Sequence, residues 1–172
     1  MRYGTGGVGS LLHLGVEQLL ANTKTQMVHV PYKGGGPMMQ DVVAGQVEMV
    51  VTAVDFTKRF TESGQLKALA IADTTRHALL PNVPTTAEVG MPELLVVSWF
   101  GILGPAGLPK GIVESIGKEV AAALEDGTLK ERLLNVGATA AYMNANDYGR
   151  HIAEEYPRWA RLVKDANIPL QD

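Results

Sequence analysis

The sequence contains no cysteine, which excludes disulfide bonds, thiolate metal sites and a cysteine nucleophile. It has no apolar run near the ~20 residues that span a bilayer. The formal net charge of −3 shows no surplus of Lys and Arg to neutralise phosphates, so we expect no nucleic-acid partner. The remaining composition, 46% hydrophobic and 19% charged, is typical of a globular protein.

Glycine and proline recur at regular intervals along the chain and separate short apolar runs. The apolar pattern predicts strands at 27–30, 47–52, 66–72, 94–103 and 139–143, and helices at 11–22, 37–44, 55–63, 112–125, 129–136 and 146–166. The almost continuous apolar run at 66–72 suits a strand buried on both faces. Thr85 and Glu88 fit a capping box. Alternating strands and helices predict an α/β fold with a mostly parallel sheet flanked by helices.

A glycine-rich loop, Gly4–Gly9, satisfies G-x-G-x-x-G, the dinucleotide-binding fingerprint. That fingerprint also needs a preceding strand and an acidic residue ~20 positions further on. Only three residues precede Gly4, and Val28–Val30 contains no acid, so we disfavour a dinucleotide. The loop has two other uses: an anion site built from backbone N–H groups, a helix N-terminus and the Ser10 hydroxyl, or an ordinary turn with Ser10 as N-cap. Both stay open from spacing alone.

The other candidate motifs lack the spacing that catalysis or metal binding requires. Gly34–Gly36 is not a Walker loop, because Lys33 precedes the glycines, but it suits a second anion-facing turn. The histidines have no metal-ligand spacing, and Ser10 and His13 lie in no nucleophile elbow. We therefore predict no catalytic residue, no metal and no cofactor.

Six segments together, in order along the whole chain, match the pattern of one family. They are Tyr3–Ser10 with His13–Leu14, Val28–Gly35, Asp41–Met49, Gly64–Ala70, Leu80–Thr85 with Glu88–Gly90, and Ser98–Gly101 with Pro105–Gly107. The series resembles the substrate-binding receptors of tripartite tricarboxylate transporters, the Bug receptor family. The resemblance implies a periplasmic-binding-protein-like fold of type II, with two α/β lobes that close on a ligand.

The resemblance also implies a function in binding rather than in catalysis. Such receptors are periplasmic, work with the membrane components of the transporter, and hold a tricarboxylate, dicarboxylate, acidic amino acid or aromatic acid. Backbone amides, hydroxyls and waters supply the contacts. We expect the ligand-binding residues to be Thr5, Gly7, Gly9, Ser10, Tyr32 and Thr52. Thr52 stands where the family often has Asp, which keeps a polar group without its charge.

Family members begin with a signal peptide and a first lobe, and the segment Met1–Gly4 resembles neither. We therefore expect an N-terminally truncated receptor, with 1–100 as part of lobe two and 101–172 as the segment that completes lobe one. The apolar stripes of 101–172 are expected to pack against lobe two, a second copy of the chain or a separately encoded fragment. Two alternatives stay open: an α/β enzyme that uses Gly4–Ser10 for a nucleotide or phosphate, and a fragment without binding activity.

Overall fold

A computed structural model describes residues 1–166 and 168, and its contacts divide the chain into two compact units. Unit 1 comprises Met1–Ser98 together with the chain from Trp159 onward, and unit 2 comprises Trp99–Arg158. Each is described by itself. The assignment of 1–100 and 101–172 to two lobes of a binding protein stays a prediction.

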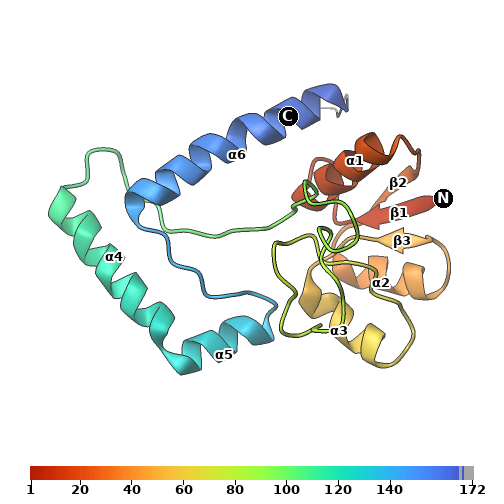
Figure 1. Cartoon of the computed structure of the whole chain (residues 1–172), viewed down its shortest axis with the longest axis horizontal. Helices are drawn as coiled ribbons and strands as arrows, with labels where there is room; N and C mark the ends of the chain where they lie inside the picture. The colour runs from red at the N-terminus through yellow and green to blue at the C-terminus, as the bar shows by residue number, and fades with distance from the viewer. Residues whose placement is uncertain (167, 169–172) are drawn as a thin grey trace. The chain divides into compact units, whose positions relative to one another are not determined.

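Unit 1 is built on a three-stranded parallel sheet with the order β2-β1-β3 (Figure 1). β1 spans Arg2–Thr5, β2 spans Val28–Pro31 and β3 spans Met49–Val50. The helices of this unit are α1 (Leu11–Thr23), α2 (Gly35–Val43) and α3 (Val54–Glu62). The predicted α/β class with a parallel sheet flanked by helices is confirmed.

The central strand β1 was not predicted, and it includes Gly4 and Thr5, which the sequence analysis placed in the glycine-rich loop Gly4–Gly9. Arg2–Thr5 pairs with both neighbours, with Tyr3 opposite His29 of β2 and opposite Met49 of β3. Pairing on both edges compensates for the low strand preference of a segment that contains glycine. A buried cluster of Tyr3, Val16 and Leu20 lies on the α1 face of this strand, and Met38 and Met39 of α2 are also buried.

Three other predicted strands, at 66–72, 94–103 and 139–143, are not strands in the structure. An extended segment becomes a strand only when a neighbour accepts its ladder of hydrogen bonds. Within these segments, the described residues make one isolated bridge, between Ile71 and Thr85. Leu69 is 64% exposed, so the apolar run at 66–72 is not buried on both faces as predicted.

The predicted capping box at Thr85 is confirmed, although a turn rather than a helix follows it. The Thr85 N–H donates to Glu88 Oε2 at 2.7 Å, and the Glu88 N–H donates to Thr85 Oγ1 at 3.2 Å. The Arg76 guanidinium donates two hydrogen bonds to the same carboxylate, with Nε 2.9 Å from Oε2 and Nη2 2.9 Å from Oε1. The hydrogen bond from Arg76, followed by that from Thr85, lowers the pKa of Glu88 to about 2.

We expect Arg76→Gln to raise the pKa of Glu88 toward its ordinary value of 4.5, because the main stabiliser of the carboxylate is removed. Because the pKa of Glu88 is lower in the folded chain than in the unfolded chain, its carboxylate stabilises the fold above pH 4.5. This contribution is lost as the pH falls toward 2. The variant should therefore lose less stability between neutral pH and pH 3 than the unchanged chain. Carboxyl ¹³C NMR and thermal unfolding measure both effects. Arg150→Gln, which removes an ion pair with Asp147, is the control. A Glu88 that already titrates near 4.5 in the unchanged chain contradicts the interpretation.

Unit 2 is helical and has no buried residue between 99 and 158. It contains α4 (Lys110–Glu125), α5 (Gly127–Asn135) and most of α6 (Ala145–Asp165), which runs on through Pro157 into unit 1. Asp126 caps α5 by accepting the Leu129 N–H at 2.8 Å. No helix in the described part of the chain has the length and apolarity to cross a membrane.

Candidate functional site

The six predicted binding residues lie at one edge of the sheet, where the parallel strands end. Thr5 closes β1, Tyr32 follows β2 and Thr52 follows β3. The Tyr32 N–H donates to the Thr5 carbonyl at 2.9 Å, which holds the ends of β1 and β2 together. The glycine loop leaves β1 at this same edge and carries Gly7, Gly9 and Ser10 into α1. Ligands of open α/β sheets bind at such carboxyl edges.

The glycine loop requires glycine because of its backbone φ angles, and not because a side chain would lack room. Gly7 has φ 142° and Gly9 has φ 74°, conformations that other residues rarely adopt, and a Cβ at either position would meet nothing within 4 Å. Ser10 is the N-cap of α1, as the sequence predicts, and its Oγ accepts the His13 N–H at 3.2 Å. The loop is therefore shaped by local chemistry that the sequence displays.

Three hydroxyls of the predicted site, those of Thr5, Ser10 and Tyr32, have partners within the chain. Ser10 Oγ donates to the Gly7 carbonyl at 2.9 Å, and the buried Thr5 Oγ1 lies 2.7 Å from His29 Nε2. The Tyr32 hydroxyl donates to Asp41 Oδ2 at 2.8 Å. Among the described residues, no hydrogen bond uses the N–H groups of Gly6, Val8, Leu11 and Leu12.

The side chains of Thr5 and Tyr32 lie on opposite faces of the sheet. Thr5 contacts His29 on the α1 face, where Tyr3 also points. A Cβ on Gly4 would lie 3.0 Å from Tyr32 Cε2 and 3.1 Å from Met38 Cγ of α2, so the tyrosine ring covers the α2 face. A cleft shared by Tyr32 and Thr52 stays a prediction.

A cluster of ring side chains beneath the glycine loop was not predicted as part of the site. The rings of His13 and His29 stack with centroids 4.0 Å apart, and Tyr3 stacks on His29 at 4.9 Å. The Tyr3 hydroxyl donates to Glu17 Oε1 at 2.6 Å. Burial lowers the pKa of His13, while nearby Glu17 opposes the shift. Burial and then the neighbouring His13 lower the pKa of His29.

The same loop does not complete a nucleotide site. β1 now supplies the preceding strand, but the end of β2 carries Val30, Pro31 and Tyr32 and no acid to hold a ribose. Among the described residues, no group of three or more His, Asp or Glu side chains is arranged to hold a metal ion.

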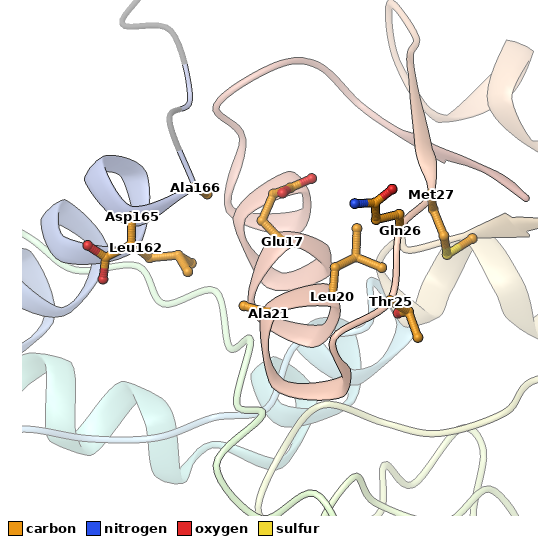
Figure 2. A pocket seen from close by; sticks show the side chains of 9 residues that line it. All are labelled: Glu17, Leu20, Ala21, Thr25, Gln26, Met27, Leu162, Asp165 and Ala166. Atoms are coloured by element: carbon orange, nitrogen blue, oxygen red, sulfur yellow. The ribbon is translucent and has the colours of Figure 1, made fainter.

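A pocket of about 400 Å³ in unit 1 is lined by nine residues, none of which belongs to the glycine loop (Figure 2). α1 contributes Glu17, Leu20 and Ala21, and the connection to β2 contributes Thr25–Met27. The end of α6 contributes Leu162, Asp165 and Ala166. The pocket therefore sits beside the second half of α1 and the start of β2, not at the carboxyl edge where the predicted residues gather.

The model of one family, the tripartite tricarboxylate transporter family receptor, matches residues 1–168. The chain belongs to this receptor family. Protein BugT of Bordetella pertussis is 30% identical over 98% of this chain and 52% of its own length. A UPF0065 protein encoded in the tcbD-tcbE intergenic region of Pseudomonas sp. strain P51 is 30% identical over 98% of this chain. The chain covers 50% of that protein, so it spans about half the length of these relatives.

Two solved structures that resemble this chain were determined with a ligand. An R. palustris protein solved with adipate is 33% identical, with a TM-score of 0.80 over 98% of this chain and 56% of that one. MatC from Rhodopseudomonas palustris, solved with bound malate, is 29% identical, with a TM-score of 0.72 over 95% of this chain and 56% of that one. The periplasmic binding protein BugD is 28% identical, with a TM-score of 0.73 over 99% of this chain and 58% of that one, and this likeness supports a periplasmic-binding-protein fold.

Proposed function

We propose that this chain forms part of a periplasmic receptor that captures a small organic carboxylate for a tripartite transporter. The observation that carries the proposal is the family match over residues 1–168. Two structural relatives that hold the dicarboxylates adipate and malate support the ligand class. The membrane components of the transporter are the proposed partners. The proposed activity is capture and delivery, without bond-making chemistry.

The arrangement at the carboxyl edge of the sheet suits an anionic ligand. The N–H groups of Gly6, Val8, Leu11 and Leu12 donate to no acceptor among the described residues. A helix N-terminus adds roughly half a positive charge, which favours a carboxylate. We propose that Thr5, Gly7, Gly9 and Ser10 shape this carboxylate-binding loop, and that Tyr32 and Thr52 border it.

Calorimetric titration at neutral pH tests the proposal. Adipate, malate and citrate are the probes, and NAD and ATP are the comparison ligands. We expect saturable binding of at least one carboxylate and none of either nucleotide. Binding of a nucleotide alone supports the α/β enzyme alternative. No binding of any probe to a folded chain means that this chain lacks a competent site.

We expect Ser10→Ala to weaken carboxylate binding by about 1–3 kcal/mol if its hydroxyl turns to the charged ligand. The change also removes an N-cap, which costs about 0.5–2 kcal/mol of stability. Asp126→Ala is the matched control, because Asp126 caps α5 in unit 2. Titration and thermal unfolding separate the two effects. If both variants lose stability and neither loses affinity, Ser10 acts in capping alone.

A further inference from the structure

Each end of the glycine loop is held by one of two stacked imidazoles. At the α1 end, the Gly9 N–H donates to His13 Nδ1 at 3.1 Å. At the β1 end, Thr5 Oγ1 and His29 Nε2 lie 2.7 Å apart. The two rings are nearly parallel, with centroids 4.0 Å apart and an interplanar angle of 19°. The conformation of the loop therefore depends on two titratable imidazoles, those of His13 and His29, which contact each other.

The hydrogen bond from Gly9 fixes the protonation state of His13. An N–H donor requires a lone pair on Nδ1, so the ring is neutral with its proton on Nε2. A second proton would place an N–H on Nδ1, facing the N–H of Gly9, and would break this contact. Protonation of both rings would also set two positive charges face to face at 4.0 Å.

The charged and titratable groups around the pair come from two elements, α1 and β1. α1 contributes Glu17, whose Oε1 lies 3.7 Å from His13 Nε2. β1 contributes Tyr3, whose hydroxyl donates to that same oxygen. Glu17 favours a charged imidazole, but burial outweighs it, and the pKa of each histidine is lowered below its ordinary 6.5.

We propose that His13 and His29 are positioning residues that hold the glycine loop in its ligand-receiving conformation only while His13 is neutral, so that acidification releases the loop and its ligand. The proposal rests on the proposed function of the loop. The direction of the pH effect follows from the lowered pKa values of the two histidines. The imidazoles bind a proton less readily while they hold the loop than after the loop is released, so a fall in pH favours release. The loop is therefore held above pH 6.5 and is released progressively as the pH falls below that value.

Two substitutions preserve the hydrogen bonds and remove the titration. In His13→Asn, the amide oxygen replaces Nδ1 as acceptor for Gly9. In His29→Gln, the terminal amide replaces Nε2 beside Thr5. His77→Asn is the matched control, because His77 Nδ1 also accepts a backbone N–H, from Leu79 at 3.2 Å, away from this loop.

The experiment follows the ¹⁵N-labelled full chain by NMR from pH 7.5 to 4.5, reading the glycine-loop amides and the imidazole nitrogens. We expect the Gly9 amide to exchange at least tenfold faster, after correction for intrinsic rates, as the two rings take up protons below pH 6.5. His77→Asn should keep this profile, and the double variant His13→Asn/His29→Gln should lose it.

Three outcomes overturn the inference: rings that titrate without any response of Gly9, a Gly9 profile that survives in the folded double variant, or rings that stay neutral throughout. If the double variant does not fold, the ring and amide titrations of the unchanged chain decide. Adipate binding, measured in parallel, separates the two proposals. Absence of adipate, malate and citrate binding at pH 7.5 rejects the proposed function, while the loop titration still tests the histidine pair.

Discussion

Replacing Tyr3 by alanine is expected to lower the free energy of unfolding by about 3–5 kcal/mol, as truncations of buried aromatic side chains do. Tyr3 is fully buried in the central strand, between the α1 residues Val16 and Leu20 and the ring of His29. Its loss removes the largest buried side chain of unit 1 and leaves a cavity. Domains are stable by only about 5–15 kcal/mol, so the change is a large fraction of the total. Urea unfolding followed by circular dichroism measures it.

Tyr3→Phe is the matched variant, because it keeps the ring and removes only the hydroxyl that donates to Glu17 at 2.6 Å. We expect a smaller loss, about 1–3 kcal/mol, from the carboxylate left without this donor. Equal losses in the two variants would place the importance of Tyr3 in its hydroxyl. A negligible loss in both would show that the core of unit 1 lies elsewhere.

The chain on its own is expected to bind a hydrophobic dye strongly and to self-associate at micromolar concentration. In unit 2, Phe100 is 92% exposed, Ile102 71% and Leu103 73%. Along α4, Ile112 and Ile116 are 49% and 43% exposed. Burying one such side chain stabilises by about 1.5–3 kcal/mol, so a partner that covers several of them gains a large free energy. Light scattering and dye fluorescence measure both effects.

A triple variant, Phe100→Ser with Ile102→Ser and Leu103→Ser, should reduce dye fluorescence several-fold and shift the chain toward the monomer. The control changes exposed polar residues of α4, Glu114→Ser with Lys118→Ser, and should alter neither readout. A dye-silent monomer of the unchanged chain contradicts the prediction. The partner that covers this surface, a second copy or a separately encoded segment, stays a prediction.

Features specified by neighbouring residues were predictable from the sequence. Ser10 before an apolar periodic run indicates a helix start, and Thr85 with Glu88 indicates the reciprocal capping bonds that the structure shows. Features specified by distant pairing were not. β1 exists because Tyr3 lies opposite both His29 and Met49. The apolar run at 66–72 lacks such a paired strand among the described residues, and its pattern alone did not reveal this.

The candidate site divides in the same way. Glycine loops and strand ends indicate the carboxyl edge of a parallel sheet, and the predicted residues lie there. The contacts of the individual side chains do not follow from the spacing. The stack of His13 on His29 arises from the register of β2 and the rotation of α1, which no local motif encodes. The best signal in the sequence was His13, three residues after the N-cap Ser10.

The position of β1 in the middle of the sheet has a consequence during synthesis. The ribosome makes Arg2–Thr5 before either of its neighbours, and the second neighbour is complete only at Val50. At about 5–20 residues per second, the strand waits a few seconds for that partner. During this interval its backbone donors and acceptors are open to any other nascent strand. The strand in the middle of the sheet therefore keeps one unpaired edge, the edge that pairs with β3, until Val50 has been made.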